Sequence, residues 1–189
     1  MNIGVDIDDT ITFTSEYIEE YMNEYSKHYL GDDSLREYIT DVMRGRLTNE
    51  LVRQFYLENS LKMASNFELK PKAKETLAKL REERNRIIII TARSETYYPN
   101  VQDFCEDYLR RKEVQFDKVI TAAKDKVKAC QDEKIDLLID DSITTCENLT
   151  QNGINALVFN SRLNKQKETF CPRAEDWDEV YSFVHKMKK

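Results

Sequence analysis

The sequence feature that most constrains the fold is a run of four consecutive isoleucines, Ile87 to Ile90. A continuous β-branched apolar run is typical of a strand that is covered on both faces, as in a parallel sheet. Further short apolar segments precede Asp6 and occupy 116–121, 135–139 and 155–159, with amphipathic helical patterns between them. Strands that alternate with helices in this way predict an α/β protein with a doubly wound parallel sheet.

Residues 15–68 interrupt this alternation with a stretch that contains no proline. Apolar residues recur there at helical spacing in three successive patterns, which predicts a small all-helical unit. The patterns span 18–29, 35–43 and 51–56. We therefore expect a core of residues 1–14 and 69–189, with a helical cap of residues 15–68 inserted after the first strand. Within the core, the polar segment 160–173 is expected to be a loop.

The composition is typical of a soluble globular protein: of 189 residues, 40% are hydrophobic and 34% are charged, and the formal net charge is -6. A net negative chain argues against a dedicated binder of nucleic acid polymers, which usually has a basic face. It allows a small phosphorylated substrate, because one cationic pocket is sufficient. No apolar run approaches the length that a membrane span needs, and the four cysteines form no CxxC pair. We therefore expect reduced thiols and a cytoplasmic location.

The first apolar segment ends in Asp6-Ile7-Asp8-Asp9-Thr10. Asp6 and Asp8 are two residues apart, so in an extended segment their carboxylates point the same way. Two such carboxylates repel unless a cation lies between them, and a hard divalent ion such as Mg²⁺ suits oxygen ligands. Ligands of open α/β sheets bind outside the carboxyl ends of the strands, where these acids lie. Asp9 is expected to be a turn residue.

Polar residues also follow the later strands. Thr91-Ala92-Arg93 follows the isoleucine run, Lys124 and Lys126 precede a helix, and Asp140-Asp141 follows 135–139. Taken singly, each group has an ordinary interpretation as a turn acid, a helix-start residue or a surface charge. In a parallel sheet these strand ends lie along one edge, so the groups can converge. Their combination therefore predicts a catalytic site.

With these residues in this order, the chain resembles the haloacid dehalogenase superfamily of phosphotransferases. The first motif of that superfamily matches Asp6 to Thr10, the second matches Thr91, the third a lysine at 124 or 126, and the fourth Asp140-Asp141. The residues around Thr91 and Asp140 are most similar to the 5'(3')-deoxyribonucleotidase branch and related nucleotidases. The match covers nearly the whole chain, and the inserted helices resemble the small helical cap of the superfamily.

The resemblance implies that Asp6 is the nucleophile, which forms an aspartyl-phosphate. Mg²⁺ would bind the side chains of Asp6 and Asp140 and the backbone carbonyl of Asp8. Asp8 would protonate the leaving oxygen and later take a proton from water, so it should be more basic than Asp6. Lys126 is preferred to Lys124 as the motif lysine because it lies at the start of the helix.

The expected substrate contacts come from both the core and the cap. Thr91 would donate its hydroxyl to a phosphate oxygen, and backbone amides at a helix start would add donors. Arg93 would reach a substrate phosphate or form an ion pair with the cap. Cap aromatics among Phe55, Tyr56, Tyr17 and Tyr21 would stack on a nucleobase, although apolar helical stripes usually pack within a core. The full set of expected substrate-binding residues is Thr10, Thr91, Ala92, Arg93, Lys126, Phe55 and Tyr56.

Two further residues extend the comparison. Asp141 is expected to hold the motif lysine or a metal-bound water from outside the first ring of ligands. The segment after the last strand departs from the nucleotidase pattern, because Asn164 is present but the aspartate and proline that often precede that asparagine are absent. This departure bears on the choice of substrate and leaves the core chemistry unaffected.

The predicted function is hydrolysis of a small phosphate monoester, foremost a nucleoside monophosphate, by a Mg²⁺-dependent phosphatase. A sugar phosphate or another small metabolite is the alternative substrate, and a phosphomutase would share the first step. A non-catalytic phosphate-binding regulatory domain is the alternative of another class. It would not need the complete set Asp6, Asp8, Thr91, Lys126 and Asp140. The expected partner is the small substrate, and the protein is expected to be a monomer or a homodimer.

Overall fold

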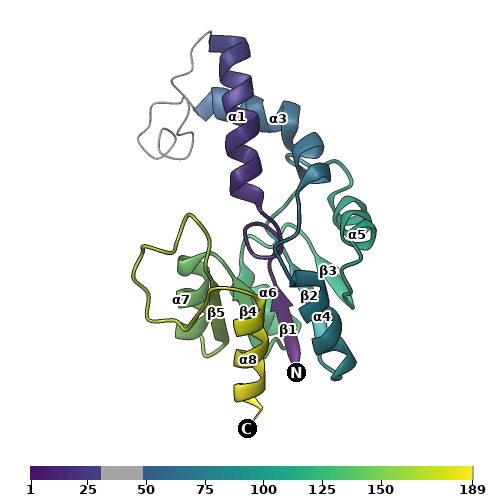
Figure 1. Ribbon diagram of the computed structural model, residues 1–189, viewed down its shortest axis with the longest axis vertical. Coiled ribbons are helices and arrows are strands. Elements are labelled where there is room, and N and C mark those ends of the chain that lie inside the picture. Colours follow the sequence, from purple (N-terminus) through teal and green to yellow (C-terminus); the bar gives the residue numbers. More distant parts are fainter. Residues whose placement is uncertain (31–48, 189) are drawn as a thin grey trace.

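The computed structural model describes residues 1–30 and 49–188 of the chain (Figure 1). Its strands are β1 (Asn2–Val5), β2 (Arg86–Ile90), β3 (Lys118–Ile120), β4 (Leu137–Asp140), β5 (Asn155–Phe159) and β6 (Arg173–Ala174). Its helices in the core are α4 (Ala73–Glu82), α5 (Val101–Arg111), α6 (Lys126–Asp132), α7 (Ile143–Gln151) and α8 (Trp177–Met187). Two longer helices, α1 (Thr14–Leu30) and α3 (Asn49–Asn66), lie within the expected cap.

The six strands form one sheet in the order β3-β2-β1-β4-β5-β6, and every neighbouring pair is parallel. The predicted doubly wound α/β fold is therefore confirmed. The chain runs outward from β1 through β2 to β3, and then returns to the other side of β1 to form β4. The strand order thus reverses between β1 and β4, and such a reversal opens a crevice at the carboxyl ends of the two strands.

The isoleucine run explains the three layers of the core. Ile87 and Ile89 pack with residues of α4, α5 and α8 on one face of the sheet. Ile88 and Ile90 pack with residues of α6 and α7 on the other face. All four side chains are fully buried, because successive residues of a strand point to opposite faces and helices cover both.

One local prediction was wrong at its end. Segment 160–173 is not all loop, because Arg173 begins β6, which pairs with Val158 and Phe159 of β5. Two paired residues are too few to give a periodic sequence signal. After Pro71, the chain turns at Lys72, which has a φ of 64°, and α4 begins at Ala73.

Helices α1 and α3 rise above the carboxyl edge of the sheet, at the upper end of Figure 1. The two connections to the core run side by side: the amide of Phe13 donates to the carbonyl of Glu68 at 3.0 Å, and that of Lys70 to Ile11 at 2.8 Å. This antiparallel contact fits the predicted boundaries at 14 and 69, which stay a prediction. The helical pattern expected at 35–43 lies outside the described residues.

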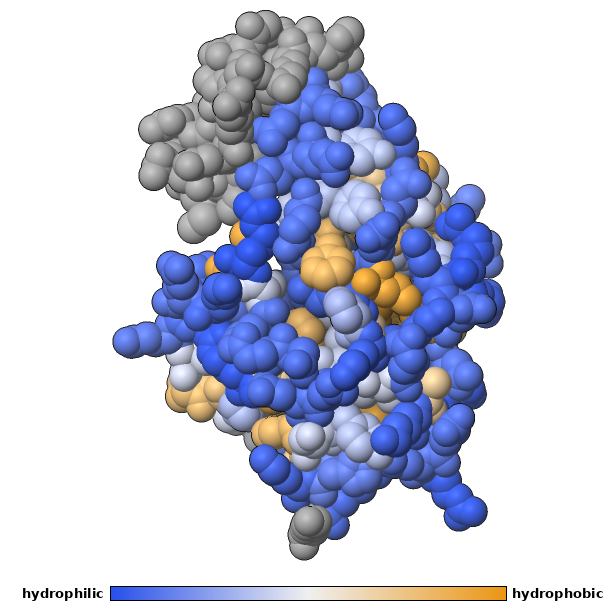
Figure 2. All heavy atoms as spheres, viewed as in Figure 1, coloured by the Kyte–Doolittle hydropathy of each residue, from blue (hydrophilic) through white to orange (hydrophobic). Residues whose placement is uncertain are grey.

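The visible surface is mostly hydrophilic, with a few apolar side chains near the waist between the upper helices and the sheet (Figure 2). Across the part of the chain that the structure describes, the exposed large apolar side chains are Leu57, Leu61 and Phe170. None of the described helices is long and apolar enough to cross a membrane.

Candidate active site

The candidate site lies at the reversal point of the strand order. Val5 of β1 stands opposite Ile139 of β4, so the next residues, Asp6 and Asp140, leave the sheet side by side. The amide of Asp6 donates to the carbonyl of Ile139 at 3.0 Å, which extends the pairing by one residue. Asp6 is 6% exposed and Asp140 is 1% exposed. Two carboxylates buried this close together need a cation.

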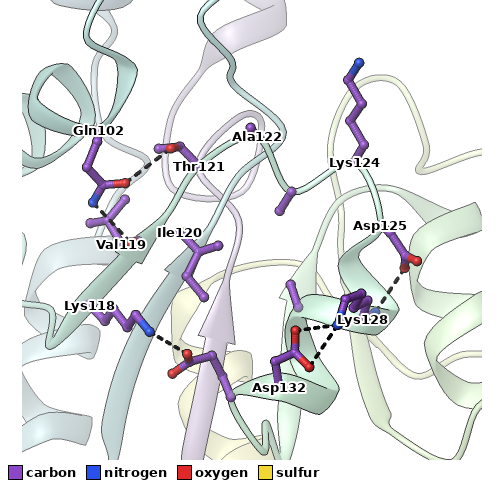
Figure 3. A pocket seen from close by; sticks show the side chains of 13 residues that line it. Gln102, Lys118, Val119, Ile120, Thr121, Ala122, Lys124, Asp125, Lys128 and Asp132 are labelled. Carbon is purple, nitrogen blue, oxygen red and sulfur yellow. Dashed lines mark hydrogen bonds and ion pairs between the residues drawn. The ribbon is translucent and has the colours of Figure 1, made fainter.

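Lys126 supplies part of that charge. Its Nζ atom lies 2.6 Å from Asp6 Oδ1 and 2.7 Å from Asp140 Oδ2. Lys126 is the first residue of α6, where the side chain of the preceding Asp125 accepts a hydrogen bond from the Lys128 amide and fixes the helix start. Lys124 is exposed, and its side chain extends away from the other labelled residues in Figure 3. The structure thus brings Lys126, and not Lys124, to the acids.

A third carboxylate completes the acidic cluster, which we define as Asp6, Asp140 and Asp141. Ligand atoms of these three residues all lie within 4.8 Å of one another. Asp140 Oδ1 accepts from the amide of Ser142 at 2.8 Å, and Asp141 Oδ2 accepts from the hydroxyl of Ser161 at 3.2 Å. These hydrogen bonds fix both carboxylates. Asp141 was expected outside the first ring of ligands, but β4 ends at Asp140 and the Asp141 carboxylate lies within the cluster.

The cluster fits a divalent cation. When all three are ionised, the carboxylates carry three negative charges and the Lys126 ammonium carries one positive charge, which leaves two negative charges among the grouped side chains. Carboxylate oxygens are the ligands that Mg²⁺ prefers, and a charge of two matches the remainder. The side chain of Asp8 does not belong to this group in the structure.

Asp8 turns instead toward Arg93. Arg93 Nε lies 3.0 Å from Asp8 Oδ2, and Nη2 lies 2.6 Å from Oδ1. The hydroxyl of Thr14, the first residue of α1, donates to the same Oδ1 at 2.8 Å. The extended geometry expected for Asp6 and Asp8 is absent because β1 ends at Val5 and Asp9 has a φ of 55°. The chain turns here, so the two carboxylates diverge.

These environments shift the pKa values in opposite directions. Burial, opposed by Lys126 and reinforced by Asp140, raises the pKa of Asp6 to about 7. Burial and the charge of Asp6 raise the pKa of Asp141 to about 8. Burial would also raise the pKa of Asp8, but the charge and hydrogen bonds of Arg93 bring it below its ordinary value. The expected order, with Asp8 the more basic, is therefore reversed in the chain alone and would require a cation at Asp6.

The residues after β2 hold the second motif without a helix. Thr91 is fully buried, its amide donates to the carbonyl of Ile120 at 2.9 Å, and its hydroxyl accepts from the amide of Arg93 at 3.2 Å. Ala92 is exposed. The donors expected from a helix start beside Thr91 are absent, because a loop separates Thr91 from α5, which begins at Val101. Backbone amides of a helix start are therefore not among the hydrogen-bond donors beside Thr91.

Two residues of the first motif support the turn. Asp9 accepts a hydrogen bond from the amide of Ser15 at 2.8 Å, which ties the turn to the start of α1. Thr10 is fully buried, and its hydroxyl has no hydrogen-bond partner among the described residues. Both side chains lie inside the fold, so they shape the loop that carries Asp6 and Asp8.

Asn164 organises the far side of the acidic cluster. Its side-chain amide donates to the carbonyls of Asp141 at 2.6 Å and Phe159 at 2.9 Å. It thereby links the loops that follow β4 and β5. The aspartate and proline that often precede this asparagine are absent, yet Asn164 still links the two loops. In the sequence, the asparagine alone indicates this link.

The two cap aromatics have different surroundings. Phe55 is fully buried, with ring centroids 5.3 Å from Tyr25 and from Tyr56. Tyr56 is only partly buried, and its ring lies 5.6 Å from that of Tyr97, in the loop between β2 and α5. Phe55 is thus part of the buried hydrophobic cluster, whereas Tyr56 lies where α3 meets the loop after β2.

A separate groove of about 540 Å³ lies between the edge strand β3 and α6 (Figure 3). Its charged side chains are largely paired with each other, Lys118 with Glu133 and Lys128 with Asp132. It contains none of the acids of the cluster. The strand-end cluster therefore remains the candidate catalytic centre.

A reversing parallel sheet, with one acid after β1, a lysine opening α6 and two acids after β4, defines the haloacid dehalogenase class of hydrolases. The family profile described as "5' nucleotidase, deoxy (Pyrimidine), cytosolic type C protein" matches residues 1–189, and the chain belongs to this family. Family membership identifies the chain as a phosphoric monoester hydrolase.

Solved structures agree on the fold. A haloacid dehalogenase-like hydrolase from Streptococcus pneumoniae has 18% sequence identity and a TM-score of 0.68, covering 97% of each chain. A predicted phosphatase from Clostridium acetobutylicum has 14% identity and a TM-score of 0.69, covering 98% of each chain. CbbY from Rhodobacter sphaeroides, in complex with phosphate, has 17% identity and a TM-score of 0.64, covering 95% of each chain. No curated protein sequence matches the chain.

Proposed function

We propose that the chain is a Mg²⁺-dependent phosphatase that hydrolyses a nucleoside monophosphate through an aspartyl-phosphate on Asp6. The observation that carries the proposal is the position of Lys126, whose ammonium touches both Asp6 and Asp140 at the strand-order reversal. A cationic group beside a nucleophilic carboxylate can also hold the phosphoryl group that the carboxylate attacks. Membership of the nucleotidase family supports the substrate class.

The proposed metal site consists of the carboxylates of the acidic cluster together with the backbone carbonyl of Asp8. When bound there, Mg²⁺ would neutralise charge on the phosphate and align it for in-line attack. Asp6 would remain ionised beside that charge, since an adjacent cation favours a carboxylate over the carboxylic acid. This would restore the pKa order that the mechanism needs.

The reaction has two steps. In the first, a carboxylate oxygen of Asp6 attacks phosphorus, the bond to the ester oxygen breaks, and Asp8 gives that oxygen a proton. In the second, water attacks the phosphorus of the aspartyl-phosphate, Asp8 takes a proton from the water, and the Asp6 carboxylate leaves. Lys126 and the hydroxyl of Thr91 would stabilise charge on the transferring phosphoryl group in both steps.

We propose that residues 15–68 act as the cap that selects the leaving group. Tyr56 is the better placed of the two aromatics, because it is partly exposed at the junction with the core, whereas Phe55 is fully buried. A nucleobase that entered at this junction would meet an aromatic face. The cap would then add substrate specificity to chemistry supplied by the core.

A substrate panel tests the proposal directly. With Mg²⁺, we expect pyrimidine deoxynucleoside 5'-monophosphates to have a kcat/KM at least about fivefold above that of sugar phosphates, since one well-placed ring contact contributes about 1 kcal/mol. Released phosphate measures the rate, and protein treated with a chelator is the control. Equal, slow rates over the whole panel would reject the nucleotide substrate.

A sugar phosphate remains the second candidate because of one structural relative. CbbY from Rhodobacter sphaeroides, in a variant form, is described in complex with xylulose-(1,5)bisphosphate, and its fold matches with a TM-score of 0.62. The same panel separates the two candidates: a sugar phosphate that exceeds every nucleotide would assign the chain to that substrate class.

Metal binding should depend on pH. The folded chain keeps protons on Asp6 and Asp141 up to pH values near 7 and 8, whereas an unperturbed aspartate loses its proton near 3.8. Between these values the folded state binds more protons than the unfolded state, so the free energy of unfolding falls as pH rises. Mg²⁺ displaces these protons. We therefore expect thermal stabilisation by Mg²⁺ to grow with pH, reaching about 2–3 kcal/mol at a roughly hundredfold excess over Kd.

Thermal unfolding with and without Mg²⁺ gives the stabilisation by the ion at one pH. Comparing that stabilisation near pH 5.5 and near pH 8.5 measures the linkage. Proton release on titration with Mg²⁺ at about pH 7 gives an independent readout. Replacing Asp141 with asparagine should reduce both effects. The same Mg²⁺ stabilisation at both pH values would contradict binding to these carboxylates.

A further inference from the structure

Arg93 has a role that its place in the second motif does not reveal. Its side chain is 2% exposed and gives one hydrogen bond to each oxygen of Asp8, at 3.0 and 2.6 Å. A guanidinium engaged in this two-point pair has little freedom to turn toward a substrate phosphate. Of the two roles expected for Arg93, contact with a substrate phosphate stays a prediction. The ion pair that the structure shows is with Asp8 of the first motif and not with residues 15–68 as far as these are described.

Three aromatic rings hold the guanidinium in place. Its central carbon lies 5.6 Å from the ring centroid of Phe67, 5.4 Å from Tyr98 and 5.9 Å from Tyr108. We call these three residues the aromatic cage. Each ring face attracts the cation at distances of this order. The hydroxyl of Tyr108 donates to the carbonyl of Phe67 at 2.8 Å, which joins two walls of the cage.

The cage lets Arg93 fix Asp8 from the core side. Asp8 itself is 34% exposed at its side chain, so its carboxylate is anchored on one side and open on the other. Thr14, the first residue of α1 and the last residue of the expected core before the cap, adds a single hydrogen bond. The two bonds from Arg93 define the plane of the carboxylate, because a planar fork meets both oxygens at once. One bond from Thr14 could not do so.

We propose that Arg93 is a positioning residue that holds the Asp8 carboxylate in the orientation needed to transfer a proton to and from the reacting oxygens. This inference rests on the proposed function, in which Asp8 is the acid and base. It assigns the aromatic cage a part in catalysis, since the rings keep the guanidinium from moving. A misplaced catalytic group can cost about 10²-fold in rate, so loss of the clamp should be measurable.

The test uses two esters that differ in their need for an acid. A nucleoside monophosphate releases a strongly basic alkoxide that must be protonated, whereas 2,4-dinitrophenyl phosphate releases an anion that needs no proton. In Arg93→Lys, we expect kcat/KM for the nucleotide to fall by about 10²-fold and that for the dinitrophenyl ester by less than about tenfold. KM for the nucleotide should change little, because no substrate contact is lost.

A second signature comes from the other half of the reaction. Hydrolysis of the aspartyl-phosphate still needs Asp8 to take a proton from water, whatever the ester. With 2,4-dinitrophenyl phosphate, Arg93→Lys should therefore release one equivalent of dinitrophenolate in a rapid burst, followed by slow turnover. Arg81→Lys is the matched control, because Arg81 also gives two hydrogen bonds to one aspartate, Asp117, but away from the site. Its rates should equal those of the wild type.

A double variant separates positioning from folding. In an Asp8→Asn background, Arg93→Lys should cause almost no further loss, since the group it orients is gone. Tyr98→Leu, which opens the cage but keeps the guanidinium, should give the same leaving-group dependence with a smaller loss, and it provides the test if Arg93→Lys does not fold. Equal losses for both esters without a burst would overturn the inference. Wild-type protein that hydrolyses neither ester with Mg²⁺ would instead reject the proposed function, and the positioning role with it.

Discussion

Asp6→Asn is expected to reduce phosphate-ester hydrolysis by at least about 10⁴-fold while leaving the fold intact. An amide cannot serve as the attacking carboxylate, so no aspartyl-phosphate can form. The loss should be equally large for the dinitrophenyl ester, because attack at phosphorus is needed for every leaving group. Phosphate release with Mg²⁺ gives the rate, and circular dichroism with thermal unfolding checks the fold.

The fold is expected to survive because Asp6 is destabilising in its ionised form. Burial beside Asp140 raises its pKa to about 7, so the neutral amide removes a charge that the interior opposes. The hydrogen bond with Lys126 is retained in part, since the amide oxygen still accepts. Asp136→Asn is the matched control: Asp136 accepts from the amide of Asn2 at 2.7 Å, before the start of β4 and at the other end of the sheet. Undiminished turnover in Asp6→Asn would contradict a mechanism through an aspartyl-phosphate on Asp6.

Lys126→Met should affect both stability and rate. Removing the ammonium leaves Asp6 and Asp140 buried and without their shared cation, and breaking a buried pair in this way costs about 3–5 kcal/mol. Part of the cost is expected to disappear at low pH, where protonated carboxyls need no partner. Turnover should fall by about 10²–10³-fold, because charge on the transferring phosphoryl group loses a stabilising contact.

Lys124→Met provides the comparison, since Lys124 lies two residues away and is exposed. We expect its stability to stay within about 0.5 kcal/mol of the wild type and its turnover to be unchanged. Chemical denaturation and phosphate release measure both variants under the same conditions. If Lys124→Met lost more activity than Lys126→Met, the lysine of the third motif would have to be reassigned.

Much of the fold could be predicted from local patterns. The isoleucine run gives β2, and the alternation around it gives the remaining long strands and helices within a few residues, because side-chain periodicity reflects burial directly. β6 was missed because two residues carry no period.

The residues that form the candidate site were predicted better than the contacts between them. Asp6, Lys126 and Asp140 meet as expected, because parallel strands bring their carboxyl ends to one edge. Asp141 can join the acidic cluster because β4 ends at Asp140, one residue before it. Phe55 was expected among the substrate contacts, yet the structure buries it fully, as the alternative interpretation allowed.

The sequence by itself determined the class of fold and the order of the reactive groups, since both follow from residues that are neighbours along the chain. Tertiary structure alone decided which of those groups contact one another. Lys126 and Asp6 are separated by 120 positions, and Arg93 and Asp8 by 85. The direction of each side chain depends on where its strand ends and how the next turn bends, as at Asp9. These local backbone conformations place Asp6 in the acidic cluster and Asp8 against Arg93 in its aromatic cage.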